Sequence, residues 1–203
     1  MNLIEIVVWF LYNISSFFCH QLPERSFFIA EYKLPVCARC TGIYLGAFFS
    51  YLLLPFLLRN KRIRVGVLDT LIYILPLAVD GLLQLLGLGW RNNYTRLITG
   101  ALAASSTALF AVVLALSLFF DLFKMEAALH DSTWLKTTTK LCFISATLTV
   151  VVLVFSLFSG SFLVFIMLSI FLAHYAILHN VILPIIVVFL TVIYLLRSPT
   201  YST

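Results

Sequence analysis

The sequence predicts an all-α fold, a bundle of membrane-spanning helices that forms a single domain over residues 1–203. Hydrophobic residues make up 63% of the chain and charged residues only 10%, whereas soluble domains average roughly 45–50% apolar and about 25% charged residues. Uninterrupted apolar runs such as residues 150–157 exclude the alternating pattern of a β-barrel. Because only helices or closed barrels can cross a lipid interior, the chain is predicted to be an integral membrane protein.

About seven helices are predicted, since each span needs about 20 largely apolar residues. The first segment lacks a basic region and a small-residue cleavage site, so we expect a retained helix rather than a signal peptide. Glu5 and Asn13 make this helix a poor span, either tilted or interfacial. Only His179 and Asn180 divide the last two segments, so six helices is the alternative count. The polar loop at 124–140 is expected to lie along the membrane surface. The predicted helices cover residues 3–19, 38–58, 67–89, 95–123, 141–157, 162–178 and 181–197.

The basic residues predict an orientation through the positive-inside rule. The segment 59–64 carries four cations and the loop 124–140 carries three, and alternating topology places both on one side, predicted to be cytoplasmic. Five cations fall on the other side, all in or beside two unusual polar segments, residues 19–46 and 80–100. We therefore expect these two segments to lie together at the extracytoplasmic face of the cell membrane.

The first polar segment, residues 19–46, reads CHQLPERSFFIAEYKLPVCARCTGIYLG. Cys37 and Cys40 form a Cys-x-x-Cys pair, while Cys19 and His20 supply a further sulfur and an imidazole. Three sulfurs and one imidazole in this arrangement are typical of the ligands of a tetrahedral zinc site. The sequence therefore predicts a zinc site formed by these four residues.

Two other interpretations of the cysteines stay open. Arg39, between the two thiols, favours the thiolate form, and an outward location is oxidising, so Cys37 and Cys40 could be a redox-active pair. A structural disulfide that ties the first loop to the second helix is the other alternative. Cys142 stands alone in an apolar segment and is predicted to fill the core.

The second polar segment, residues 80–100, reads DGLLQLLGLGWRNNYTRLITG. Helical spacing places a line of polar residues and glycine on one face of the third helix, and this line consists of Asp80, Gln84, Gly87 and Arg91. After a short loop, the fourth helix presents Gly100 and Ala103 on the same face as Arg96, and such small residues permit close helix contact.

A carboxylate within a spanning helix is costly, so Asp80 is a candidate functional residue. An Asp–Arg pair that only orders the bundle is the alternative. Arginines and amides at a helix start suit an anion, because the helix dipole and guanidinium groups both favour negative charge. Non-specific contact with lipid head groups is the alternative for this loop. The candidate anion-binding residues are Arg39, Tyr44, Arg91, Asn92, Asn93, Arg96 and Thr99.

Three blocks of the sequence resemble the signature motifs of a family of small prokaryotic multi-pass membrane proteins, catalogued as a domain of unknown function. The blocks are CHQLPERSF, PVCARCTGIYLG and DGLLQLLGLGWRNNYTRLITG. The resemblance covers roughly the first half of the chain and implies that a set of polar residues occupies motif positions, among them Cys19, Cys37, Cys40, Arg39, Asp80, Arg91 and Arg96. It implies no activity.

The two polar segments together predict a membrane-embedded, zinc-dependent enzyme that acts on a lipid-linked phosphate or another anionic, membrane-soluble substrate. Asp80 is predicted to act as the general base or to orient a water, with Gln84 and Arg25 as the other candidate catalytic residues and Arg25 also binding the anion. The expected partner is therefore a membrane lipid or a lipid-linked anion. Nucleic acid is excluded, because the cations are scattered over short loops and make no continuous basic face.

Two function classes remain as alternatives. One is a thiol–disulfide oxidoreductase, linked to quinones, in which Cys37 and Cys40 form the redox pair. The other is a transporter of metal ions or small anions, or a lipid head-group binding protein. Transport predicts a polar path to the inner face, for which His174 and His179 are the only candidates, so a packing role is the better prediction for both.

Overall fold

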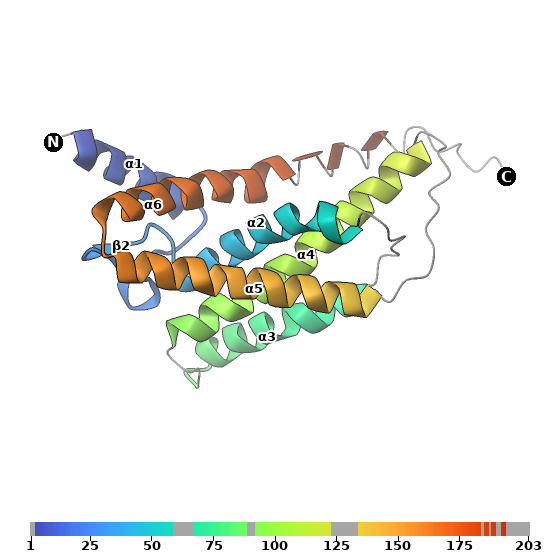
Figure 1. Ribbon diagram of the computed structural model, residues 1–203, viewed down its shortest axis with the longest axis horizontal. Coiled ribbons are helices and arrows are strands. Elements are labelled where there is room, and N and C mark those ends of the chain that lie inside the picture. The colour runs from blue at the N-terminus through green and yellow to red at the C-terminus, as the bar shows by residue number, and fades with distance from the viewer. Residues whose placement is uncertain are drawn as a thin grey trace.

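The structure is a computed structural model that describes residues 3–58, 67–88, 92–122 and 134–183, together with six positions between 185 and 193. Within these residues the chain forms six α-helices and one short hairpin (Figure 1), so the predicted helical class is confirmed. The elements are α1 (Leu3–Ser16), the single 3₁₀ turn η1 (Pro23–Arg25), β1 (Phe28–Ile29), β2 (Tyr32–Lys33), α2 (Ala38–Leu58), α3 (Val67–Leu85), α4 (Asn93–Leu122), α5 (Trp134–Ser159), α6 (Phe162–Ile177) and the π-helical segment η2 (Leu178–Ile182).

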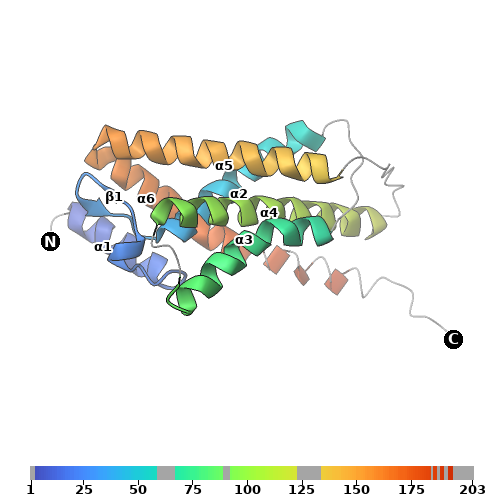
Figure 2. The ribbon, with the colours of Figure 1, turned by 90° about the horizontal axis from the view of Figure 1, so that it is seen from below.

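Helix α2 lies at the centre of the bundle and packs most extensively against α4, with α5 against both of them. Helix α3 packs against α4, as Figure 2 shows. Helices α1 and α6 pack against each other beside α2. The segment 17–37 and the ends of α3, α4 and α5 that it adjoins lie at one end of the bundle, on the left of Figure 1. The two polar segments therefore reach the same end, as the sequence predicted.

The boundaries of several predicted helices need correction. The helices predicted at 162–178 and 181–197 are not separated by a turn, because η2 continues directly from α6 through His179 and Asn180. Described positions from 183 to 193 are again helical. Helix α5 begins at Trp134 rather than at 141, so the last part of the predicted surface loop is helical. The rest of that loop, 124–133, lies outside the described residues.

Helix α3 ends four residues earlier than predicted because Gly87 stops it. Gly87 has a φ of +73°, in the left-handed region that favours glycine. Its N–H donates to Gln84 O at 3.2 Å, and the N–H of Leu88 donates to Leu83 O at 2.9 Å, the pair of bonds that closes a Schellman motif. Gly87 therefore terminates the helix immediately after the turn that carries Gln84.

Small residues set the close contact between α2 and α4. A Cβ atom added to Gly42 would lie 2.0 Å from the backbone oxygen of Leu97, and one added to Gly100 would lie 2.5 Å from that of Arg39. Gly46, four residues after Gly42, lies against Ala101 in the same way. This small-x₃-small spacing lets the two backbones touch, and it places the first turn of α2 directly beside the first turns of α4.

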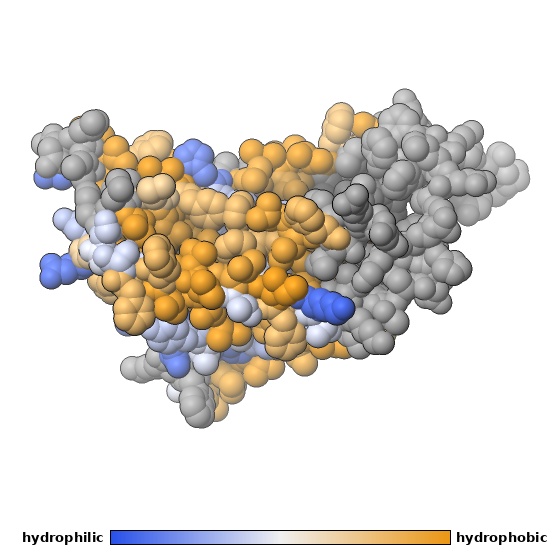
Figure 3. All heavy atoms as spheres, in the orientation of Figure 1, coloured by the Kyte–Doolittle hydropathy of each residue, from blue (hydrophilic) through white to orange (hydrophobic). Residues whose placement is uncertain are grey.

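The polarity of the described helices suits a lipid environment. Small hydroxyl groups lie in the interior, where Ser105 and Ser145 share a hydrogen bond between α4 and α5. Large apolar side chains point outward instead, including Leu75 and Leu82 on α3 and Phe155 on α5. Figure 3 shows this apolar surface over the middle of the bundle, with hydrophilic residues mainly toward the end that carries segment 17–37. An apolar surface of this extent marks a contact with membrane or with another chain.

Two helices among the described residues are long and apolar enough to cross a membrane, at Asn93–Leu114 and Thr138–Ser159. Two further apolar helices, Ala38–Leu54 and Thr70–Leu85, are shorter. The six-helix count agrees with the alternative that the sequence left open, while the number of helices that span stays a prediction.

Candidate functional site

Three of the four predicted metal ligands lie together. Cys19 lies in the loop after α1, Cys37 immediately precedes α2, and Cys40 lies in the first turn of that helix. Their sulfur atoms all lie within 4.8 Å of one another, and all four cysteines of the chain are free thiols. Ligands about 2.3 Å from a tetrahedral zinc ion are about 3.8 Å apart, so the separations of these sulfurs are compatible with three ligands of one metal ion. The cluster could therefore hold a metal ion.

The loop that carries Cys19 is held against α1 and the hairpin by several hydrogen bonds. Gln21, with a φ of +53°, turns the chain back after Cys19. Its side-chain Nε2 donates to Tyr12 O at 2.7 Å, and its carbonyl accepts from Lys33 Nζ at 2.6 Å. A left-handed conformation at a non-glycine residue is a strain that the surrounding structure must maintain. The loop conformation is thus built into the fold.

His20, the fourth predicted ligand, is exposed and does not belong to the three-sulfur cluster. The backbone N–H of Cys37 donates to Cys19 Sγ at 3.1 Å, which holds the Cys19 sulfur against the start of α2. Hydrogen bonds from Cys19 and Cys40 hold the pKa of the Cys37 thiol well below its usual range, and the bond to Cys37 raises the pKa of Cys19. The cluster therefore favours a single thiolate, at Cys37, before any ion binds.

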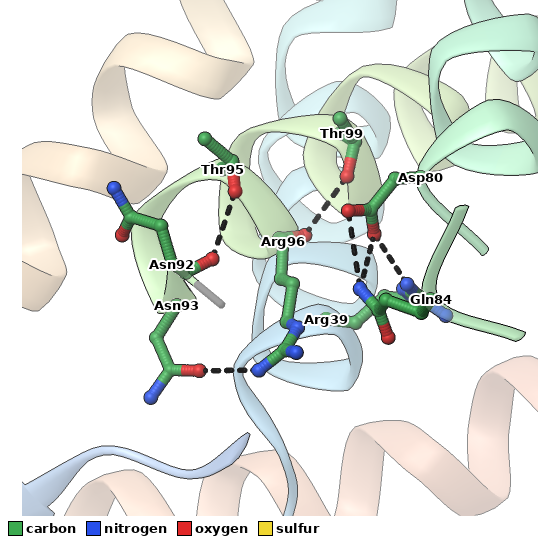
Figure 4. A network of polar contacts seen from close by, with 8 residues as sticks. All are labelled: Arg39, Asp80, Gln84, Asn92, Asn93, Thr95, Arg96 and Thr99. Atoms are coloured by element: carbon green, nitrogen blue, oxygen red, sulfur yellow. Dashed lines mark hydrogen bonds and ion pairs between the residues drawn. The ribbon is translucent and has the colours of Figure 1, made fainter. Parts of the chain in front are cut away.

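Arg39 joins the two polar segments. Its guanidinium forms an ion pair with Asp80 on α3, the interhelical pair that the sequence left as an alternative (Figure 4). Gln84 Nε2 donates to both carboxylate oxygens of Asp80, at 3.1 and 3.0 Å. The Asp80 side chain is only 14% exposed, so its two oxygens are occupied by Arg39 and Gln84.

Arg96 lies on the first turns of α4 and is 5% exposed. Its Nη1 donates to Asn93 Oδ1 at 2.9 Å (Figure 4), and its buried Nε has no hydrogen-bond partner among the described residues. Asn93 Nδ2 in turn donates to Ser26 O at 3.3 Å, which ties α4 to the loop of the first polar segment. An unpaired buried guanidinium N–H is costly, so this arrangement favours an acceptor from outside the chain.

The other predicted anion-binding residues have local roles in the structure. Asn92 Oδ1 accepts from the N–H of Tyr94 at 2.9 Å and so caps α4. The Thr99 hydroxyl donates to Arg96 O at 3.2 Å, within the same helix. Tyr44 is buried, with its ring centroid 6.4 Å from that of His179. Arg91 lies outside the described residues.

One pocket of about 250 Å³ connects these groups. It brings together eight predicted site residues, namely Cys19, His20, Arg25, Cys37, Arg39, Cys40, Gln84 and Arg96. Asp80 lies behind Arg39 and Gln84 and does not itself line the pocket. Sequence reasoning missed Phe18 and Leu22 as lining residues, because apolar residues beside a motif carry no chemical signal in an apolar chain. It also assigned no role to Gln21, whose importance is conformational.

Cationic side chains outnumber anionic ones in the pocket. Arg25, Arg39 and Arg96 line it, and Asp80 forms an ion pair with Arg39. Glu24 makes a 4.0 Å contact with Arg25, but both side chains are largely exposed, and such surface pairs contribute little. The pocket therefore combines soft metal ligands with two arginines that make no ion pair with a buried carboxylate among the described residues.

The chain is thus a small helical protein with the apolar surface of a membrane protein and a pocket of thiols and arginines at one end of its bundle. The chain belongs to the family described as "Predicted membrane protein (DUF2085)", whose model matches residues 19–110. This match covers both polar segments and confirms the resemblance seen in the sequence.

Two archaeal relatives, both uncharacterized, share this region. A protein of Methanocaldococcus jannaschii is 36% identical over 115 residues, which is 56% of this chain and 74% of the relative. A protein of Methanothermobacter thermautotrophicus is 43% identical over 98 residues, which is 48% of this chain and 87% of the relative. No solved structure matches the chain.

Proposed function

We propose that this protein is a membrane-embedded, zinc-dependent enzyme that acts on a lipid-linked phosphate or another anionic, membrane-soluble substrate. The observation that carries the proposal is that one pocket is lined by three cysteines and three arginines. A structural zinc site or a structural disulfide would explain the cysteines but would need none of the arginines. A site that binds an anion beside a metal ion uses both sets.

The ligand set favours zinc with an open position. Thiolates are soft ligands that select zinc over magnesium or calcium, and catalytic zinc sites keep three protein ligands with the fourth position open. Cys19, Cys37 and Cys40 supply three. His20 lines the same pocket but lies outside the cluster. In this proposal it occupies the fourth coordination position of the zinc ion only when no substrate is bound. Zinc in such a site lowers the pKa of bound water and polarises phosphoryl oxygens.

The arginines provide the anion site. Guanidinium groups bind phosphate oxygens through paired N–H donors, and both Arg39 and Arg96 have a buried Nε without a partner among the described residues. Arg25, at the end of η1, lines the same pocket. The proposal places the anionic group between these arginines and the sulfur cluster.

In this proposal Asp80 acts indirectly, by holding the guanidinium group of Arg39 in position. Both of its oxygens are occupied and it lies outside the pocket lining, which favours a positioning role over the general-base role expected from the sequence. Gln84, which lines the pocket and bonds Asp80, has the same role. The charge bias of the loops supports the predicted extracytoplasmic location of the pocket. In this proposal about six helices of the bundle cross the membrane.

Replacing Arg96 by alanine tests the proposed function. We expect the variant to keep its zinc but to bind butyl phosphate at least about tenfold more weakly, because a charge-assisted hydrogen bond contributes about 1.5–3 kcal/mol. Isothermal titration of the purified protein in detergent measures this affinity. Lys140→Ala is the matched control, since Lys140 is an exposed cation at the other end of α5. Unchanged butyl phosphate binding in Arg96→Ala would contradict the anion site.

Replacing Asp80 by asparagine separates positioning from base catalysis. If Asp80 orients Arg39, the variant loses butyl phosphate affinity by about tenfold while its zinc content stays unchanged, because the ion pair that holds the guanidinium is lost. If Asp80 were the general base, ligand binding would be retained. Glu31→Gln is the control, since Glu31 is exposed in the hairpin turn. The same titration distinguishes the two outcomes.

A thiol–disulfide oxidoreductase is the second candidate, favoured by one observation: the lowered pKa of Cys37 beside two thiols within 4.8 Å. A thiolate in contact with a second thiol is suited to disulfide exchange. This function leaves the arginines without a role. Transport has less support, because His174 bonds Ile170 O on its own helix at 3.0 Å and His179 lies against the rings of Tyr44 and Tyr175.

A further inference from the structure

A second cavity lies between α2 and the α6–η2 segment. It has a volume of about 440 Å³, within the range of about 300–1,000 Å³ found for sites that bury small ligands. Its lining is aromatic and aliphatic, with no carboxylate, lysine or arginine, and consists of Phe48, Tyr51, Leu52, Phe171, Tyr175, Leu178, His179 and Leu183. Leu52 and Leu178 are 54% and 44% exposed, so the groove opens onto the outer, apolar surface of the bundle.

The groove and the thiol pocket lie along one face of α2. Residues spaced by three or four positions share a helix face, and this spacing links Cys37 and Cys40 through Tyr44 to Phe48 and Tyr51. Eight residues separate Cys40 from Phe48, which is about 12 Å along the helix axis. The opposite face of α2, with Gly42 and Gly46, packs against α4. The same face of α2 therefore carries the thiols at one end and the groove lining at the other, with the buried ring of Tyr44 between them.

We propose that the groove holds the hydrocarbon chain of the substrate whose anionic group binds in the thiol pocket. This inference rests on the proposed function and names its substrate class: a single amphiphile with an anionic head and a long apolar chain. A positive pocket and an uncharged groove about 12 Å farther along the same helix face match the two halves of such a molecule. A membrane-soluble anion would enter from the lipid side, where Leu52 and Leu178 form the exposed rim.

The buried aromatic residues of the groove favour a chain over a polar ligand. Tyr175 is 7% exposed, and its ring stacks on Phe171 with centroids 5.7 Å apart. Phe48 meets the same two rings edge-on, at 5.9 and 4.9 Å. The hydroxyl groups of Tyr51 and Tyr175 are buried and have no hydrogen-bond partner among the described residues, and the lining that is exposed to the groove is almost wholly apolar.

Photocrosslinking tests the inference with two phosphates of different chain length. The probe is hexadecyl phosphate with a photoreactive diazirine at mid-chain, added to the protein in phosphatidylcholine nanodiscs, and crosslinked residues are located by mass spectrometry. We expect crosslinks at residues 48–52 and 171–183. Leu52→Trp, which fills the groove rim, lowers this crosslinking about tenfold, the effect of excluding about two methylenes. Leu75→Trp is the matched control, because Leu75 is similarly exposed on α3.

Binding of butyl phosphate, which is too short to reach the groove, reports on the pocket alone. We expect Leu52→Trp to leave it unchanged and Arg96→Ala to abolish both butyl phosphate binding and groove crosslinking. Tyr175→Phe keeps the ring and should crosslink like the native chain; its failure to crosslink would show a polar ligand and overturn the inference.

Two further outcomes separate the inference from the proposed function. If Leu52→Trp leaves the groove crosslinking unchanged while Arg96→Ala still abolishes butyl phosphate binding, the groove is not the chain site and the proposed function stands. Groove crosslinks that persist in Arg96→Ala, with butyl phosphate binding unaffected, would show an ordinary membrane lipid in the groove and contradict both.

Discussion

Replacing Cys37 by serine is expected to leave the purified protein without bound zinc. Cys37 is the centre of the cluster, because the thiols of both Cys19 and Cys40 interact with it and its own backbone N–H bonds Cys19 Sγ at 3.1 Å. Two thiolates remain in the variant, and serine is a poor ligand for zinc. Since changes that only disturb the orientation of a ligand cost about 10–100-fold in metal affinity, loss of a ligand itself should cost more.

Zinc content measured by inductively coupled plasma mass spectrometry checks this expectation. Cys142→Ser is the matched control: Cys142 is a buried thiol of α5 that lies outside the three-sulfur cluster and makes a weak hydrogen bond to Leu102 O at 3.8 Å. It should retain full zinc. A Cys37→Ser variant that copurifies with as much zinc as the native chain would exclude the proposed ligand set.

Replacing Gly42 by alanine is expected to destabilise the protein and to reduce its zinc content together. The added Cβ would lie 2.0 Å from Leu97 O and 2.8 Å from Leu97 C. Both are backbone atoms, so no side-chain rotation relieves the contact and α2 must move away from α4. Overpacking of this kind typically costs about 1–3 kcal/mol. Because Cys40 and Arg39 lie in the same turn of α2, the movement also displaces the pocket.

Gly81→Ala is the control for this variant. Gly81 is also a helical glycine near the pocket, but a Cβ there would meet only the end of the Arg39 side chain, at 3.9 Å, which is an ordinary contact. Thermal unfolding in detergent, followed by circular dichroism, should show a lower midpoint for Gly42→Ala and an unchanged or slightly higher one for Gly81→Ala, since alanine favours a helix over glycine. Equal midpoints for the two variants would show that the close approach of α2 and α4 is not needed.

The location of the site was predictable from sequence because its residue types are rare in an apolar chain. Cysteines, arginines and a carboxylate in membrane segments have few structural uses, and loop charges placed both segments at one end. The pairing of Asp80 with Arg39 was not predictable in the same way, because it depends on how three helices approach one another. The small residues Gly42 and Gly100 determine that approach, and the sequence analysis recognised only Gly100.

Local backbone details account for the remaining differences. His20 directly follows Cys19 in sequence, but its side chain is exposed whereas that of Cys19 is buried within the three-sulfur cluster. His179 and Asn180 looked like a break because they are polar, whereas the backbone continues through them as η2, and hydropathy does not distinguish these cases. The apolar groove had no sequence signal, since it depends on the separation of α2 and α6.

Elemental analysis of the native protein, combined with a count of free thiols, tests the metal pocket most directly. Purified in detergent, the chain should carry about one zinc per molecule, with Cys19, Cys37 and Cys40 protected from alkylation until a chelator is added and all reactive afterwards. A protein without zinc, in which two of these thiols are recovered only after reduction, would contradict the metal pocket and establish the thiol–disulfide chemistry in its place.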